Sequence, residues 1–211
     1  MKPYSAVLFS KKPEEDAVRS VIFIISAYFM GSIPFGYIIA SMSSGIDVRK
    51  VGSGNIGATN VTRTAGPLAG ILTMILDVFK GAFPAFLALK SISLEVACAA
   101  GFAAFLGHIT SPYMGFRGGK GVATALGVTV VLAPKVFIAA VPVGLFLFFI
   151  TRKVSVASLT GSLAGAIYAV VLLPLPVKLL AVAMVILIFV RHRSNIKRLL
   201  SGEEPSFHLK R

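Results

Sequence analysis

Long apolar runs alternate with short polar connections along most of this chain. The runs are continuously apolar and do not alternate residue by residue, so they predict helices and not strands. Within a bilayer every backbone polar group needs an internal partner, and a helix provides it over about 20 residues. We therefore expect an all-α, polytopic integral membrane protein with seven transmembrane helices. The expected helices cover residues 21–42, 67–89, 95–106, 122–133, 136–150, 156–173 and 177–190.

The polar N-terminal segment predicts a boundary near residue 20. We expect residues 1–20 to form a charged tail and residues 21–211 to form a single transmembrane domain. The run 21–42 is longer than the apolar region of a secretory signal, which has about 7–15 residues.

Composition supports the membrane assignment and raises the question of what the charge binds. The 211 residues are 56% hydrophobic and 14% charged, with a formal net charge of +13 and one cysteine. Globular domains carry about 25% charged residues. A single cysteine excludes an internal disulfide. The connections 44–65, 107–121, 151–155 and 191–211 hold 13 of the 21 Lys and Arg residues, which predicts an outside N-terminus and a cytoplasmic C-terminus.

The stretch 49–66 is rich in glycine and leads into a predicted helix. Glycine lets backbone N–H groups approach a ligand, and a helix N-terminus favours an anion. Gly52 to Gly57 also spells GxGxxG, but no strand precedes it, so we reject a dinucleotide fold. A flexible connecting loop remains the alternative.

A second glycine-rich stretch, 107–121, carries Arg117 and Lys120. It is not a Walker A motif, because Gly121 stands where Ser or Thr is required and Met114 stands where the first glycine is required. Both stretches and the basic C-terminus are expected on the cytoplasmic face. We therefore predict one anion site built from all three.

Two kinds of titratable residue have more than one interpretation. Asp77 and Lys80, three residues apart on one helix face, predict an ion pair, although a direct ligand role stays open. His192 is a candidate base, a phosphate donor or a partner of lipid headgroups. Carboxylates are sparse and no His and Cys cluster has zinc spacing, so we expect no metal and no cofactor.

Four separated blocks resemble the bacterial acyl-phosphate:glycerol-3-phosphate acyltransferases. The similarity runs from residue 31 to 204. It implies an acyltransferase domain in the bacterial inner membrane that transfers a fatty acyl group from acyl phosphate to the 1-hydroxyl of glycerol 3-phosphate. The products are lysophosphatidate and phosphate, in the first step of phospholipid synthesis. The blocks are SGNIGATNVTR (53–63), LDVFKG (76–81), GGKGVAT (118–124) and RHRSNIKR (191–198), followed by Gly202-Glu203.

The resemblance also implies a site on the cytoplasmic side. Catalytic roles fall on Ser53, Arg63, Lys120, His192 and Asn195. Substrate binding involves these five together with Gly54, Asn55, Gly57, Thr59, Gly118 and Gly119, while Asp77, Lys80 and Glu203 give structural support.

Acyl phosphate is already activated, so orientation and electrostatic stabilisation suffice for its reaction. No Ser–His–Asp arrangement and no H-x4-D motif is present, which favours direct attack by the glycerol hydroxyl. The expected partners are the two substrates and membrane lipid, without an obligate protein partner. Nucleic acid is not expected, since no aromatic-interleaved basic groove is visible. A small transporter of organic anions is the rival function.

Overall fold

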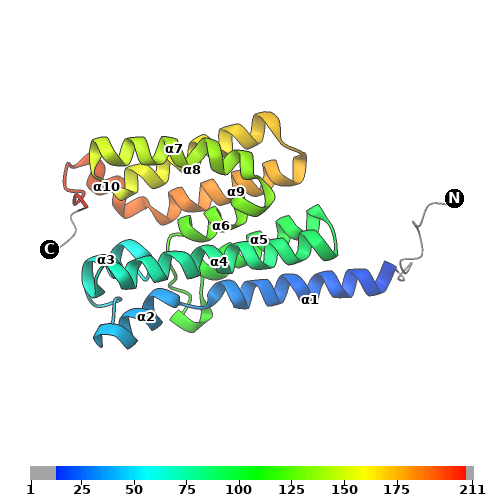
Figure 1. Ribbon diagram of the computed structural model, residues 1–211, viewed down its shortest axis with the longest axis horizontal. Helices are drawn as coiled ribbons and strands as arrows, with labels where there is room; N and C mark the ends of the chain where they lie inside the picture. The colour runs from blue at the N-terminus through cyan, green and yellow to red at the C-terminus, as the bar shows by residue number, and fades with distance from the viewer. Residues whose placement is uncertain (1–12, 208–211) are drawn as a thin grey trace.

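The computed structural model describes residues 13–207, and all regular structure in that range is helical. Figure 1 shows two layers of long helices with the short helix α6 between them. The expected all-α membrane fold is therefore confirmed. The elements are α1 Pro13–Ser32, α2 Phe35–Ser44, α3 Ala58–Ala65, α4 Pro67–Ser91, α5 Leu94–Ile109, the 3-10 turn η1 Pro112–Met114, α6 Val122–Leu132, α7 Pro134–Thr151, α8 Val154–Leu172, α9 Leu175–Arg191 and α10 Arg193–Leu200.

Five helical stretches of the described chain are long and apolar enough to cross a bilayer, and α9 with α10, bent by 60°, makes a sixth. Helix α6 has 11 residues, or about 16 Å at 1.5 Å per residue. That length is short against a hydrocarbon core of about 30 Å. Length and composition thus support five or six spans and do not establish the expected seven. The five are Glu14–Ser44 (α1 with α2), Pro67–Ser91, Leu94–Met114, Pro134–Thr151 and Val154–Leu172.

Helix α1 begins at Pro13, inside the stretch 1–20 that was expected to form a charged tail. Proline suits a first helical position, and the acidic residues Glu14, Glu15 and Asp16 in the first turn favour the positive end of the helix dipole. The acidic residues that suggested a polar tail therefore lie in the first turn of α1. Residues 1–12 of the expected tail lie outside the described part of the chain.

The first predicted helix, 21–42, is interrupted at Ile33 and Pro34. A break inside a membrane leaves backbone carbonyls that need other partners. Lys80 Nζ donates to the Ile33 carbonyl (2.8 Å), and Ser111 Oγ donates to the Ser32 carbonyl (2.6 Å). The break between α1 and α2 is thus stabilised by side chains from α4 and from the loop after α5.

Asp77 and Lys80 form the predicted ion pair, with 2.7 Å between Lys80 Nζ and Asp77 Oδ1. Both side chains are almost fully buried, and His108 Nδ1 of α5 lies 3.6 Å from the same carboxylate oxygen. The pair therefore joins α4, α5 and the α1–α2 break at one buried point.

Helix α6 packs unusually close to α4. A Cβ at Gly127 of α6 would clash with the Val78 carbonyl of α4, and a Cβ at Gly81 of α4 would clash with the Thr124 carbonyl of α6. The second glycine-rich loop also turns back into the bundle before α6, since the Gly118 N–H donates to the Ile109 carbonyl (3.2 Å). This return explains why α6 is short.

Connections that carry basic residues meet at one end of the molecule, on the left of Figure 1, where α3 and α10 also lie. Arg191 at the end of α9 donates to the Gly118 carbonyl (2.7 Å). The Phe207 N–H donates to the Arg152 carbonyl in the α7–α8 connection (2.7 Å). These contacts place the second loop, the α7–α8 connection and the C-terminal segment together.

Replacing one member of the buried ion pair should strongly destabilise the fold. Asp77→Leu and Lys80→Met should each cost about 3–5 kcal/mol, because each leaves an uncompensated buried charge. The double variant should cost less than the sum of the singles by more than about 0.5 kcal/mol, because the two residues are coupled. Reversible unfolding in mixed micelles measures these values.

Lys90→Met is the matched control, because Lys90 is exposed near the end of the same helix. It should change the free energy of unfolding by less than about 0.5 kcal/mol. Strict additivity of the Asp77 and Lys80 effects would contradict the coupling.

Candidate functional site

Asn60 of α3 organises the first glycine-rich loop, a role that the sequence prediction missed. Its Oδ1 accepts the Ser53 N–H (2.9 Å), and its Nδ2 donates to the carbonyls of Val48 and Val51 (3.0 and 3.1 Å). Gly52 has φ +64°, and a Cβ there would clash with Asn60 Oδ1. The glycine is therefore needed for the turn over Asn60.

Two glycine N–H groups of the predicted cradle have partners within the loop. Gly54 donates its N–H to the Val51 carbonyl (3.2 Å), and Gly57 donates to Asn55 Oδ1 (2.8 Å). These bonds use the two N–H groups inside the loop. The residues of the loop that face a pocket are instead Ser53 and Asn55.

Gly118 and Gly119 in the second loop are likewise held by the protein. Their N–H groups donate to the carbonyls of Ile109 (3.2 Å) and His108 (3.0 Å). Their own carbonyls accept from the Arg191 guanidinium (2.7 and 3.1 Å). These bonds fix the backbone just before Lys120, and the expected role of Gly118 and Gly119 in substrate binding stays a prediction.

Lys120 is the first member of a polar chain that crosses the site. Lys120 Nζ donates to Asn195 Oδ1 of α10, and Asn195 Nδ2 donates to Glu204 Oε1 (2.7 Å). The pKa of Lys120 is lowered to about 8, mainly by burial and also by the charges of Arg198, Arg63 and Arg191, against the opposing effect of Glu204. Lys120 thus changes charge close to physiological pH.

The acidic residue that supports the site is Glu204 and not the predicted Glu203. Glu204 is buried and accepts hydrogen bonds from Ser155 Oγ (2.7 Å), Asn195 Nδ2 (2.7 Å) and Arg198 Nε (2.8 Å). Burial alone would raise the pKa of its carboxyl, but these three donors lower it. Glu203 is exposed, and its Oε2 accepts only from Ser201 Oγ (3.1 Å) within the described chain.

His192 stands between α9 and α10 and is 2% exposed. Its Nδ1 lies 2.8 Å from the Ile188 carbonyl. Because a carbonyl only accepts, Nδ1 carries the proton and Nε2 is an acceptor in the neutral ring. Burial and the Lys120 charge lower the pKa of His192 to about 4, so the ring is neutral at physiological pH.

Arg63 belongs to α3, and its guanidinium lies over Phe207. It is in the last turn of α3, half-buried, with its guanidinium carbon 5.9 Å from the centre of the Phe207 ring. Its charge still contributes to the lowered pKa of Lys120. The structure therefore places Arg63 beside Phe207 and close enough to Lys120 for their charges to interact.

A polar pocket of about 230 Å³ brings several of the predicted residues together. Four of its lining side chains are basic, and Arg191, Arg193 and Arg198 were not among the predicted substrate ligands. Their position in the matched C-terminal block was the available signal. The polar pocket is lined by Ser53, Asn55, Lys120, Val190, Arg191, Arg193, Ser194 and Arg198.

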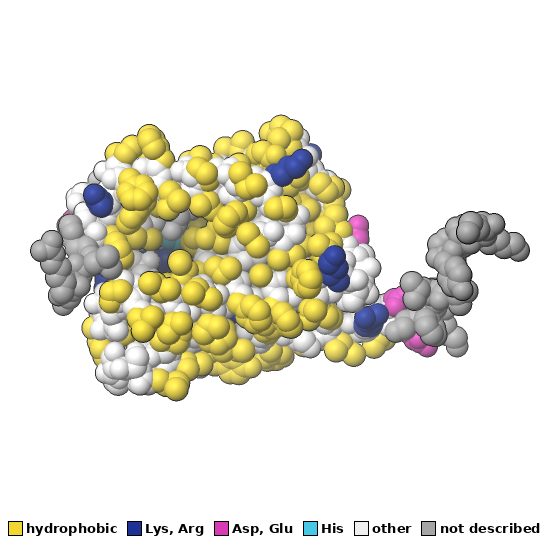
Figure 2. Space-filling view, in the orientation of Figure 1, with side chains coloured by type: hydrophobic (Ala, Val, Ile, Leu, Met, Phe, Trp, Pro, Cys, Tyr) yellow, Lys and Arg dark blue, Asp and Glu magenta, His cyan; other side chains and the backbone are white. Residues whose placement is uncertain are grey.

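An apolar cavity of about 450 Å³ is lined by residues that are close in sequence to those of the polar pocket. Lys120 lines the polar pocket and Val122 the cavity; likewise Val190 lines the pocket and Ile188 the cavity. The cavity is walled by one side of α3, α4, α6, α7, α8 and α9 and by the Phe207 ring. Figure 2 shows a hollow between apolar side chains with basic and histidine side chains deep inside it.

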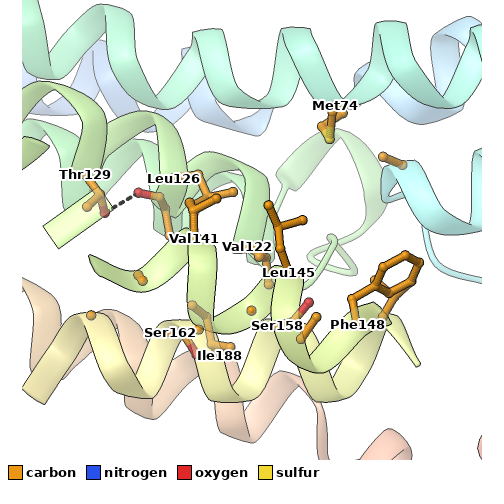
Figure 3. A pocket seen from close by; sticks show the side chains of 18 of the residues that line it. Met74, Val122, Leu126, Thr129, Val141, Leu145, Phe148, Ser158, Ser162 and Ile188 are labelled. Atoms are coloured by element: carbon orange, nitrogen blue, oxygen red, sulfur yellow. Dashed lines mark hydrogen bonds between the residues drawn. The ribbon is translucent and has the colours of Figure 1, made fainter. Parts of the chain in front are cut away.

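Thr59 belongs to the apolar cavity, next to its neighbours Ala58 and Thr62 on α3. Figure 3 shows side chains from several helices converging on this cavity, with Val122, Ile188 and Phe148 among them. The arrangement can hold an amphiphile, with an anionic head in the polar pocket and an apolar tail in the cavity.

Comparisons with a family model, with related sequences and with solved structures all point to the same protein family. A family model described as glycerol-3-phosphate acyltransferase matches residues 21–202. The glycerol-3-phosphate acyltransferase of Aquifex aeolicus (strain VF5) is 45% identical over 194 residues, covering 90% of this chain and all of the relative. That of Jannaschia sp. (strain CCS1) is 44% identical over 193 residues, covering 91% and 95%.

Two crystal structures of PlsY (YgiH), an integral membrane glycerol 3-phosphate acyltransferase, have the same fold. The glycerol 3-phosphate form matches with a TM-score of 0.86 at 44% identity. The lysophosphatidic acid form matches with a TM-score of 0.84 at 42% identity. Each comparison covers 90% of this chain and 96% of the other.

Glu204→Ala should weaken anion binding, because Asn195 and Arg198 lose the acceptor that orients them. We expect at least a tenfold lower affinity for inorganic phosphate and a loss of about 1–3 kcal/mol of stability from the donors left without a partner. Isothermal titration calorimetry and thermal unfolding in detergent measure the two effects.

Glu203→Ala is the control, because Glu203 is the residue next to Glu204, carries the same charge and is exposed. Phosphate affinity and melting temperature should stay near those of the unchanged protein. Equal effects of the two variants would show that only net charge matters and would contradict the network.

Proposed function

Because the chain belongs to the glycerol-3-phosphate acyltransferase family, we propose how its own residues divide the work of that reaction. The enzyme transfers a fatty acyl group from acyl phosphate to glycerol 3-phosphate and produces lysophosphatidate for phospholipid synthesis. The residue roles, the membrane orientation and the side of the site below are proposals.

The observation that carries the assignment of roles is that Lys120 lines a basic polar pocket while Val122, two residues later, lines an apolar cavity. Acyl phosphate has an anionic head and a long apolar tail, and glycerol 3-phosphate is small and anionic. The tail fits the cavity by the hydrophobic effect. The two phosphate groups then lie side by side in the polar pocket.

The first loop receives the phosphate of the acyl donor. Ser53 and Asn55 line the polar pocket, and Thr59 lines the cavity where the acyl chain enters. Gly54 and Gly57 shape this loop through their internal hydrogen bonds. The side chains of Ser53 and Asn55 supply its polar contacts.

Glycerol 3-phosphate and the departing phosphate are held by the basic residues. Lys120, Arg193 and Arg198 line the polar pocket, and Asn195 fixes Lys120 through its Oδ1. Arginine and lysine donate charge-assisted hydrogen bonds to phosphate, which are about twice as strong as neutral ones. Arg63 stands at the mouth of the cavity and supports this charge from α3.

The chemical step is a direct displacement. The 1-hydroxyl oxygen attacks the acyl carbon, the bond from that carbon to the phosphate oxygen breaks, and the hydroxyl proton passes to a phosphate oxygen. His192 Nε2 accepts a hydrogen bond from the neighbouring 2-hydroxyl and orients glycerol 3-phosphate, while the 1-hydroxyl donates to the phosphate oxygen. Lys120 stabilises the negative charge that develops on the leaving phosphate. Because the substrate hydroxyl attacks the acyl carbon directly, no acyl-enzyme forms.

We also propose that the chain crosses the membrane seven times, with the N-terminus outside and the site and C-terminus on the cytoplasmic side of the bacterial inner membrane. Two observations support it. The second loop contacts Arg191, and Arg152 contacts Phe207, so α6 and α7 must leave and return to the same end. That end also collects most of the Lys and Arg residues, as the positive-inside rule requires.

Activity on acyl phosphate should depend on Lys120 and Arg63. Purified protein given palmitoyl phosphate and glycerol 3-phosphate, without acyl-CoA, should release phosphate and form lysophosphatidate. Lys120→Ala and Arg63→Ala should each lower kcat/KM by at least about a hundredfold, the size expected for a lost charge contact to the transition state.

Lys135→Ala is the control, because Lys135 is an exposed lysine at the start of α7, at the opposite end of the bundle. It should keep near-normal activity, and all variants should elute as folded protein in size-exclusion chromatography. Near-normal turnover of both site variants would overturn the proposed roles.

The reaction should slow as pH rises through about 8, the pKa of Lys120. Above that pH the free enzyme loses the ammonium charge that attracts phosphate, so kcat/KM for glycerol 3-phosphate should fall. Lys120→Arg should remain flat over the same range at a lower rate, because its guanidinium stays charged. An unchanged inflection in Lys120→Arg would assign the pH effect to another group.

A further inference from the structure

The apolar cavity is open at one end and closed at the other. At the open end lie Val122 of α6, Phe148 of α7 and Ile188 of α9, within a few residues of the polar pocket or of the α7–α8 connection. Met74 of α4 and Leu145 of α7 also line this part, and both are about half exposed. These half-exposed side chains show that this end reaches the outer surface of the bundle.

The opposite end is closed by tightly packed side chains. Val136 of α7 lines the cavity, is 5% exposed and belongs to the buried core with Ala133, Val177 and Leu180. A Cβ added at Gly165 of α8 would lie 3.1 Å from Val136 Cγ1. Beyond Val136 the space is therefore filled by core residues, and the cavity ends there.

Small residues line the deep half of the cavity. Thr129, Ala140, Ala166 and Ala181 come from α6, α7, α8 and α9 respectively. Ser162 of α8 lies between this region and the open end and appears beside Ile188 in Figure 3. The depth of the cavity is thus set by short side chains above a fixed floor.

The depth can be compared with an acyl chain. Twelve residues of α7 separate Val136 from Phe148, which is about 18 Å at 1.5 Å per residue. An extended alkyl chain advances roughly 1.3 Å per carbon, given bonds of about 1.5 Å. About 14 carbons therefore fit between the floor and the open end, and the first carbons of the chain lie beyond it at the polar pocket.

We propose that the floor at Val136 and Gly165 sets the acyl-chain length that this enzyme accepts, with an optimum near 16 carbons. The proposal rests on the proposed placement of the acyl chain in this cavity. The methyl end of a matching chain reaches Val136, a shorter chain leaves part of the cavity unfilled, and a longer chain leaves carbons at the polar pocket. Each methylene that is not buried loses about 0.8 kcal/mol, or roughly a factor of four in kcat/KM.

The test measures kcat/KM for saturated acyl phosphates of 10 to 20 carbons with the full-length protein in lipid nanodiscs. Val136→Ala deepens the cavity and should move the optimum to longer chains by one or two carbons. Ser162→Leu fills the middle and should favour 12 over 16 carbons by at least tenfold relative to the unchanged enzyme, because several methylenes lose their place.

Each variant has a matched control on the same helix. Val143→Ala removes the same two methyl groups from an exposed position of α7, and Thr160→Leu adds similar bulk on α8 at a position outside the cavity. Both controls should keep the original chain-length profile.

The outcomes separate the two levels of the proposal. If the unchanged enzyme turns over these acyl phosphates but Val136→Ala and Ser162→Leu keep its chain-length profile, the floor is not the determinant of length. If the unchanged enzyme turns over none of them, the proposed function fails instead. Opposite shifts in the two variants, with unchanged controls, support the inference.

Discussion

The hydrogen-bonded chain from Lys120 through Asn195 to Glu204 is the interaction on which the site depends. Each residue donates a hydrogen bond to the next one, and Ser155 and Arg198 also donate to the Glu204 carboxylate. A buried polar network is favourable only when its groups have partners, because each unmet donor or acceptor costs free energy. The network therefore holds a lysine in place while keeping its charge available to a substrate.

A second constraint comes from the membrane environment of the backbone. Non-helical segments inside the bundle need partners for their N–H and C=O groups. Lys80 and Ser111 donate hydrogen bonds to the carbonyls at the break after α1. Arg191 donates to the Gly118 carbonyl of the second glycine-rich loop. Several polar side chains that resemble substrate ligands in the sequence thus form hydrogen bonds with backbone carbonyls. Only a few polar side chains remain to line the polar pocket.

The membrane helices could be predicted from the sequence, because apolar run length and positive charge placement report directly on bilayer insertion. The four motif blocks were identified through their resemblance to a known family. The pairing of Asp77 with Lys80 could also be predicted, since helical spacing fixes their shared face. The sequence did not show whether Glu203 or Glu204 is the carboxylate that supports the site. This choice depends on how the chain turns at Gly202, with φ +76°, after α10.

The same limit applies to the glycine loops. Their flexibility is visible in the sequence, but the partner of each N–H depends on three-dimensional contacts such as that of Gly57 with Asn55 Oδ1. The helical start at Pro13 was missed because charges that favour a helix N-terminus also favour a solvated tail. The local composition is equally compatible with a helix N-terminus and with a solvated tail.

A crystal structure with glycerol 3-phosphate and a non-hydrolysable acyl phosphonate would show where both substrates bind. We expect the phosphonate within hydrogen-bonding distance of Lys120 and Ser53, with the alkyl chain running past Ile188 toward Val136. An alkyl chain bound outside this cavity, or a phosphonate remote from Lys120, would contradict this expectation.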